Sequence, residues 1–122
     1  MVERGVYDWG DCGMAVLATV VSKPTANRAI IDAGSKVFSS DLLGMTGHGY
    51  VPAYPSVTFD RMSEEHGVLT WPDGAAAPDI GERLKVIPNH CCVVTNLANC
   101  LVMTEGSRVT GIEPVVARGL VT

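Results

Sequence analysis

Short apolar runs separated by Gly, Pro and polar turns recur along the chain. The run at residues 14–22 (MAVLATVVS) ends at a Lys-Pro pair and predicts a strand that is central in a sheet or buried on both faces. Residues 28–32 (RAIID) predict a second, shorter strand. Further strands are expected at residues 68–71, 84–87, 100–104, 108–113 and 115–118. The spacing predicts about seven or eight short strands.

Turn residues separate these runs and mark two longer loops. Gly106 lies between the apolar segments 100–104 and 108–113, where a glycine supplies the positive φ of a tight hairpin turn. Residues 39–55 are rich in Gly and Pro, and a loop of this length in a compact domain is more often functional than accidental. Residues 72–78 (PDGAAAP) predict a plain surface loop.

The length and composition predict a single, mainly β domain. Compact domains usually have ~100–150 residues, and this chain has 122. Hydrophobic residues make up 47% of it, and valine occupies 17 positions, whereas helical periodicity is scarce. No linker or repeat divides the sequence. We therefore expect one domain over residues 1–122, built as a small β-barrel or sandwich.

Charge and cysteine content narrow the function classes. The net charge is −4 and the nine Lys and Arg are scattered, so a nucleic-acid or anionic-membrane surface is not expected. No apolar run approaches the ~20 residues of a membrane span, and residues 1–11 lack the apolar core of a signal peptide. We therefore expect a cytoplasmic protein whose four cysteines are reduced thiols or metal ligands.

The segment at residues 88–92 (PNHCC) combines two side chains that suit a metal. The imidazole of His90 and the thiolate of Cys92 match Zn²⁺, and in an extended backbone they would share one face. The alternative is that both cysteines are small core residues. The β-branched residues 93–95 favour a strand, whereas the Pro-Asn pair could begin a short helical turn. Two protein ligands would leave metal positions open to water, substrate or another domain.

A second cluster lies at residues 63–67 (SEEHG). Glu64 and Glu65 could orient a metal-ligating histidine, or His66 could itself be a third ligand. The alternative is a polar loop before the next strand, with both carboxylates solvated.

A third cluster follows the strand at residues 28–32. A glycine turn after Asp32 would present Asp32 and Lys36 at a sheet edge, where catalytic side chains often lie. The alternative is an ion pair between these two residues. In the loop at residues 39–55, Tyr50 and Tyr54 could form a lid or a partner contact, or be half-buried with their hydroxyls in water.

Gly-rich phosphate loops, dinucleotide-binding fingerprints and nucleophile elbows are absent from the sequence. Taken in order, a set of segments instead resembles the C-terminal domain of the D-serine dehydratase and D-threonine aldolase family. The segments are VLATVVS at 16–22, RAIIDAGSK at 28–36, SSD at 39–41, SEEHGVL at 63–69, GERLKVIPNHCC at 81–92, NL at 96–97 and VVARG at 115–119.

The resemblance implies the β-rich C-terminal domain of an alanine-racemase-like (fold type III) pyridoxal-phosphate (PLP) enzyme. In that family an N-terminal (β/α)₈ barrel holds PLP through a Schiff-base lysine, and the C-terminal domain holds a divalent metal. Carried over, His90 and Cys92 become ligands of Zn²⁺, or of Mn²⁺ or Mg²⁺, with the His-x-Cys pair of the dehydratases in place of the His-x-Asp of the aldolases. Glu64, Glu65 and His66 fall near the metal, and the helical turn after His90 becomes the favoured structure.

The resemblance also places Asp32 and Lys36 beside the cofactor cleft, with Tyr50 as a further candidate. A 122-residue chain cannot hold a barrel of ~250 residues. None of its lysines, Lys23, Lys36 and Lys85, resembles the Schiff-base lysine. We therefore expect PLP to be held by the N-terminal barrel of a parent enzyme, which would be the partner of this domain.

The implied activity is β-elimination from a D-3-hydroxy amino acid, giving a 2-oxo acid and ammonia. The domain alone is expected to be inactive and to contribute to a homodimer. One alternative is an aldolase that cleaves D-3-hydroxy amino acids to glycine and an aldehyde. The other is a stand-alone metal-binding or dimerisation module without catalysis.

Overall fold

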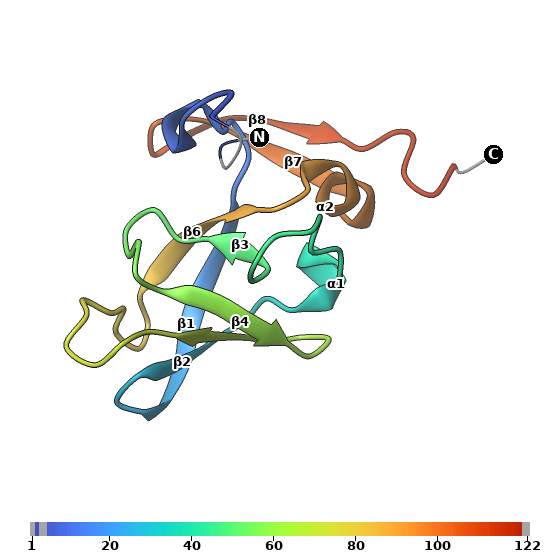
Figure 1. The fold of residues 1–122 in the computed structure, drawn as a ribbon. Helices are drawn as coiled ribbons and strands as arrows, with labels where there is room; N and C mark the ends of the chain where they lie inside the picture. Colours follow the sequence, from blue (N-terminus) through green and yellow to red (C-terminus); the bar gives the residue numbers. More distant parts are fainter. Residues whose placement is uncertain (1, 3–4, 121–122) are drawn as a thin grey trace.

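Six strands curl into a nearly closed antiparallel barrel (Figure 1). A computed structural model of the chain describes residue 2 and residues 5–120, so the signal-peptide prediction lies partly outside the described residues. The strands are β1 (Val16–Thr25), β2 (Arg28–Ile31), β3 (Gly49–Tyr50), β4 (Thr58–Met62), β5 (Gly67–Thr70) and β6 (Arg83–Pro88). Their order around the barrel is β3-β6-β1-β2-β5-β4.

The long strand β1 holds the barrel together. Its first part, residues 16–19, pairs with β6, and its second part, residues 20–25, pairs with β2. Register irregularities interrupt the second pairing, and such bulges bend a strand. The edge strands β3 and β4 meet where the His48 amide donates a hydrogen bond to the Phe59 carbonyl at 3.0 Å.

The barrel interior is filled by one face of each strand, because successive side chains of a strand point to opposite sides. On β1, Ala18 and Val20 are buried, whereas Leu17 is 62% exposed. The run at residues 14–22 is therefore central in the sheet, as predicted, but only one of its faces is buried. The largest fully buried side chains include Phe59, Ile31, Leu69, Leu84 and Val86.

The remaining elements lie outside the barrel. They are a 3₁₀ turn η2 (Trp9–Asp11), the helices α1 (Ser35–Phe38) and α2 (Cys91–Leu97), and the two-stranded sheet of β7 (Cys100–Glu105) and β8 (Arg108–Pro114). Figure 1 shows α1 and α2 side by side at one edge of the barrel, with the β7–β8 hairpin beyond them. Within the described residues, no helix has the length and apolarity to cross a membrane.

The predicted mainly β barrel is confirmed, with differences in detail. The strands expected at residues 28–32, 68–71, 84–87, 100–104 and 108–113 are present within a residue or two. The strand expected at residues 115–118 is wrong, because this segment turns: the Arg118 amide donates to the Val115 carbonyl at 3.1 Å. Strand β4 was not predicted, and the loop at residues 39–55 contains the short strand β3.

Candidate metal centre

His90 and Cys92 lie where β6 ends and α2 begins. His90 is the residue before the helix, with an extended backbone (φ −135°, ψ 100°), and Cys92 is the second helical residue. The short helical turn is thus present after His90, in place of a strand. All four cysteines are free thiols, as expected, and Cys91 and Cys92 are exposed. The alternative that this cysteine pair belongs to the core is therefore wrong.

A carboxylate from a distant loop contacts the His90 ring. Asp41 Oδ2 lies 2.7 Å from His90 Nδ1, and an ionised carboxylate only accepts hydrogen bonds, so Nδ1 carries the proton. The other oxygen of Asp41 accepts a hydrogen bond from the Leu43 amide at 2.9 Å. The His90 contact, followed by the Leu43 amide, lowers the pKa of the Asp41 carboxyl. Asp41 is therefore held as an anion facing the imidazole.

Cys92 borders an open hollow on the surface. The hollow has a volume of about 340 Å³ and is lined by Ser39, Cys92, Val93, Asn96 and Leu97. Its walls come from α2 and from the residue that follows α1. Within residues 2 and 5–120, no three His, Cys, Asp or Glu side chains converge into a metal-binding group. A metal bound by His90 and Cys92 would therefore keep coordination positions open to other ligands.

The cluster at residues 63–67 forms an ion-pair network with Lys36. Lys36 Nζ contacts Glu65 Oε1 and lies 3.7 Å from Glu64 Oε2. The Glu65 carboxylate raises the pKa of Lys36, and Lys36 lowers the pKa of Glu65. His66 is exposed on the same loop and belongs to no three-membered metal-binding group in the part of the chain that the structure describes.

Asp32 has a backbone partner. Its Oδ1 accepts a hydrogen bond from the Thr19 amide, and its own amide donates to the Thr19 carbonyl at 3.1 Å. The expected ion pair between Asp32 and Lys36 is therefore wrong, because Lys36 turns toward the glutamates. Asp32 fastens the end of β2 onto β1.

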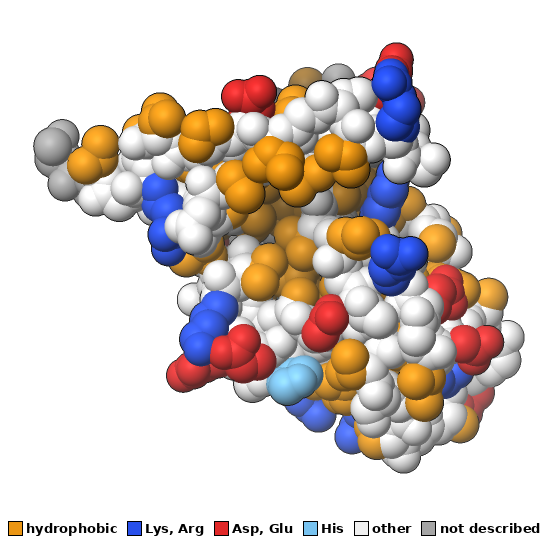
Figure 2. All heavy atoms as spheres, turned by 180° about the vertical axis from the view of Figure 1, so that it is seen from behind, with side chains coloured by type: hydrophobic (Ala, Val, Ile, Leu, Met, Phe, Trp, Pro, Cys, Tyr) orange, Lys and Arg blue, Asp and Glu red, His pale blue; other side chains and the backbone are white. Residues whose placement is uncertain are grey.

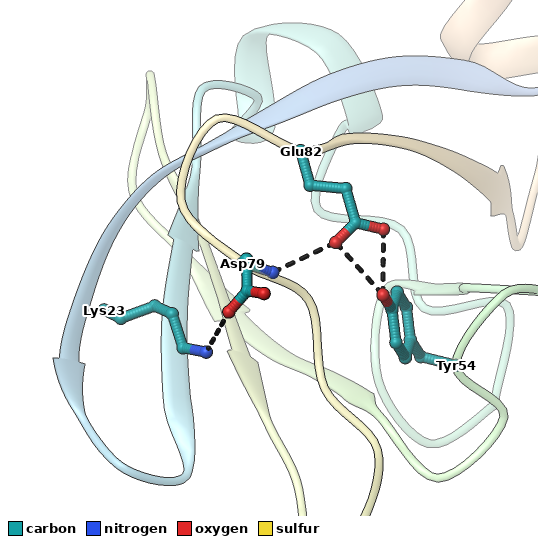
Figure 3. A network of polar contacts seen from close by, with 4 residues as sticks. All are labelled: Lys23, Tyr54, Asp79 and Glu82. Carbon is teal, nitrogen blue, oxygen red and sulfur yellow. Dashed lines mark hydrogen bonds and ion pairs between the residues drawn. The ribbon is translucent and has the colours of Figure 1, made fainter.

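The two tyrosines of the loop at residues 39–55 are half-buried but differ in their contacts. The Tyr50 ring stacks on Trp9, with centroids 4.0 Å apart. The Tyr54 hydroxyl donates to Glu82 at 2.9 Å, and Glu82 also accepts from the Asp79 amide (Figure 3). The Glu82 carboxylate raises the pKa of Tyr54. Tyr54 thus links its loop to the residue before β6, and its hydroxyl has a protein partner in place of water.

Solved structures define the class of this fold. The D-threonine aldolase of Filomicrobium marinum superposes with a TM-score of 0.78 at 34% identity, over 89% of this chain and 29% of the aldolase. The D-threo-3-hydroxyaspartate dehydratase of Delftia sp. HT23 gives a TM-score of 0.67 at 29% identity, over 82% and 31%. Variants of that dehydratase with a histidine or a cysteine replaced by alanine have also been solved, the cysteine variant in a metal-free form.

The fold is thus shared with one part of larger D-amino-acid enzymes. Residues 13–104 match the family described as "Putative serine dehydratase domain", and the chain belongs to this family. An uncharacterized protein of Mycobacterium tuberculosis is 36% identical over 97% of this chain and 92% of its own length. This relative has nearly the same extent as the chain, whereas the chain spans less than a third of the two enzymes above.

The contact between Asp41 and His90 was not predicted from the sequence. Asp41 and His90 are 49 positions apart, and no local pattern couples them. Only a short polar cluster, Ser39-Ser40-Asp41, marked the loop.

Proposed function

We propose that the chain is the metal-binding domain of a PLP-dependent lyase that acts on D-3-hydroxy amino acids by β-elimination. The observation that carries the proposal is the placement of His90 and Cys92 at the start of α2, with Cys92 on an open hollow. In the Delftia dehydratase, the replaced histidine and cysteine are also two positions apart. That correspondence supports His90 and Cys92 as the ligands.

The donor set fits a divalent metal. Imidazole nitrogen and thiolate sulfur suit Zn²⁺, with Mn²⁺ and Mg²⁺ as the other candidates. His90 and Cys92 would hold the ion, which would act as a Lewis acid toward the β-hydroxyl of the substrate. Glu64, Glu65 and Lys36 form a separate charged patch, and we propose that Lys36 restrains both carboxylates.

The residues of this chain do not fit PLP. Lys23 pairs with Asp79 at 3.1 Å (Figure 3), and Lys36 pairs with Glu64 and Glu65. Lys85 is on β6, and no lysine lines the hollow beside Cys92. We therefore propose that PLP and its lysine belong to a separate N-terminal barrel domain, and that this chain alone is inactive.

The apolar surface supports partner contacts. Figure 2 shows apolar side chains gathered on the upper, projecting part of the molecule and on the larger part below it. Exposed members on β7–β8 include Val102, Met103, Val109 and Ile112, and exposed apolar patches of this kind mark interaction sites. We propose that the exposed apolar side chains of the β7–β8 sheet contact the barrel domain and a second copy of the chain. The free thiols agree with a cytoplasmic location.

Cys92 favours elimination over aldol cleavage. The resemblance assigns His-x-Cys to the dehydratases and His-x-Asp to the aldolases. The solved aldolase nevertheless shares more identity with the chain than the solved dehydratase does, 34% against 29%. Aldol cleavage to glycine and an aldehyde is therefore the second candidate.

A chimera tests the proposal. This chain would replace the matching part of the Delftia dehydratase, and the purified chimera would be assayed with PLP, Zn²⁺ and D-3-hydroxyaspartate. We expect 2-oxo acid and ammonia, and a loss of about 100-fold or more with His90→Ala or Cys92→Ala. Cys91→Ala is the matched control and should keep the activity. Glycine and an aldehyde as products would favour the aldolase, and full activity of the His90→Ala chimera would contradict the proposal.

A further inference from the structure

The loop that carries Asp41 is held in one shape around this residue. The Asp41 amide donates to Ser39 Oγ at 3.3 Å, and Asp41 Oδ1 accepts from the Leu43 amide at 2.9 Å. Ser39 and Leu43 have positive φ values of 64° and 51°, which non-glycine residues adopt at an energetic cost. Strain of this kind, on both sides of one carboxylate, persists where the surrounding contacts require it.

The same loop is tied to the residue before His90. Asn89 Nδ2 donates to the Leu42 carbonyl at 3.1 Å and to the Gly47 carbonyl at 2.8 Å. Asn89 therefore couples the position of the loop to the backbone that carries His90. The Asp41–His90 contact is the third connection between these two segments.

This contact differs from an ordinary surface ion pair. The side chains of His90 and Asp41 are 30% and 40% exposed, whereas those of Lys36 and Glu65 are 59% and 64% exposed. Asp41 has a short side chain, and its second oxygen accepts a hydrogen bond from the Leu43 amide. The carboxylate therefore has little rotational freedom. The 2.7 Å distance is typical of a charge-assisted hydrogen bond.

We propose that Asp41 is a positioning residue for the metal ligand His90. By accepting a hydrogen bond from Nδ1–H, Asp41 fixes the ring orientation and leaves the lone pair on Nε2 for the metal. Carboxylates that hold a ligating histidine in this way raise its basicity and its affinity for metal. The inference rests on the proposed function, because it assumes that His90 is a ligand.

Nuclear magnetic resonance of the metal-free chain tests the orientation directly. The chain has three histidines, so ring ¹⁵N signals can be assigned with His48→Gln and His66→Gln. In the wild type we expect His90 to be the Nδ1–H form. Asp41→Ala should shift His90 toward the Nε2–H form, while Asp41→Asn, which keeps an acceptor oxygen, should retain more of the Nδ1–H form.

Co²⁺ titration of the same variants measures the consequence for metal binding. We expect Asp41→Ala to weaken Co²⁺ binding by about 10–100-fold, with Asp41→Asn in between. Asp60→Asn removes an exposed carboxylate that pairs with Arg61 and is the charge-matched control. It should bind like the wild type.

The outcomes separate the two proposals. If the wild type binds Co²⁺ and Asp41→Ala binds it equally well with His90 unchanged, the role of Asp41 is overturned and the metal site stands. If the wild type binds no Co²⁺, the metal site and the role of Asp41 both fall. Thermal unfolding of each variant shows whether a weaker Co²⁺ affinity comes from lost folding. If Asp41→Ala does not fold, the Co²⁺ affinity of Asp41→Asn decides the role of Asp41.

Discussion

At the scale of single residues, His48 directly precedes β3, where the edge strands β3 and β4 meet. Its ring contacts Phe59 edge-on, with centroids 5.5 Å apart, and its buried Nδ1 has no hydrogen-bond partner among the described residues. Burial lowers the pKa of His48, with Asp60 opposing the shift. The folded state therefore binds a proton at this ring less readily than the unfolded chain does.

We predict that this histidine makes the fold less stable in mild acid. As the pH falls through the unfolded pKa of about 6.5, the unfolded chain takes up a proton that the folded state resists, so the free energy of unfolding decreases. The decrease levels off below the lowered folded pKa. Urea unfolding between pH 7.5 and 5 should show a flatter dependence for His48→Gln than for the wild type.

His66→Gln, at an exposed position, is the matched control for that series. It should retain more of the wild-type slope than His48→Gln does. Equal slopes for the wild type and His48→Gln would show that burial of this ring does not govern the pH dependence.

The candidate metal ligands could be identified from the sequence, whereas the contacts between distant residues could not. The spacing of His90 and Cys92 identified the candidate ligands because imidazole and thiolate are metal donors in any backbone. The partners of Asp32 and Asp41 depend on which distant segments the barrel brings together. The side chain of Asp32 therefore bonds the Thr19 amide, 13 positions away, rather than the neighbouring Lys36.

At the scale of elements, α1 is fastened to the loop before β5. The Ser35 and Lys36 amides donate to the carbonyls of Ser63 and Glu64 at 2.9 and 3.1 Å, which satisfies donors that a helix start leaves free. The approach requires Gly34, because a Cβ there would lie 2.3 Å from the Ser63 carbonyl oxygen.

Gly34→Ala should therefore destabilise the fold by about 3 kcal/mol, because the neighbouring atoms are backbone and a close-packed site yields little. Chemical denaturation measures this change. Gly13→Ala, where a Cβ meets nothing within 4 Å, should change stability by less than about 0.5 kcal/mol. A similar, small loss of stability in both variants would contradict this, because it would show that α1 can shift away from the loop without cost.

The Tyr54–Glu82 contact is predicted to stabilise the barrel wall. Tyr54→Phe should cost about 1 kcal/mol, because it leaves a half-buried carboxylate with one donor fewer. Tyr50→Phe is the control, since the Tyr50 ring stacks on Trp9 and its hydroxyl makes no hydrogen bond to the described residues. Equal unfolding midpoints for both variants would contradict this role of the hydroxyl.

Strands were predictable where apolar residues alternate or run together and where a partner strand is available. Strand β4 (TFDRM) was not predicted because only two of its five residues are apolar. Strand β3 was not predicted because a strand of two residues shows no periodicity. Residues 115–118 are apolar enough for a strand but lie beyond the end of β8 and turn instead.

At the scale of the whole molecule, the β7–β8 sheet exposes apolar side chains. If the face of this sheet that carries Val102 and Ile112 binds a second copy of the chain, sedimentation should show association that increases with concentration. Ile112→Lys should reduce it without lowering the unfolding temperature. Ile80, which like Ile112 is 64% exposed but lies in the loop before β6, gives the matched control Ile80→Lys. A chain that remains monomeric at all concentrations would contradict the second-copy contact.

The barrel class was predictable from strand number and from the family resemblance. Its closure was not, because closure depends on the backbone contact between His48 and Phe59 and on the bending of β1. The hairpin was expected from Gly106. Its separation from the barrel was not, because it depends on the direction in which α2 leads the chain away from β6.

Zinc content tests the central claim, that His90 and Cys92 form a metal site. The purified chain would be loaded with Zn²⁺, freed of excess and analysed for metal, alongside His90→Ala, Cys92→Ala and the neighbouring control Cys91→Ala. We predict about one zinc per chain in the wild type and in Cys91→Ala, and almost none in the other two, because each ligand contributes to one site. Zinc that is absent from the wild type, or equally present in all four proteins, would contradict the account.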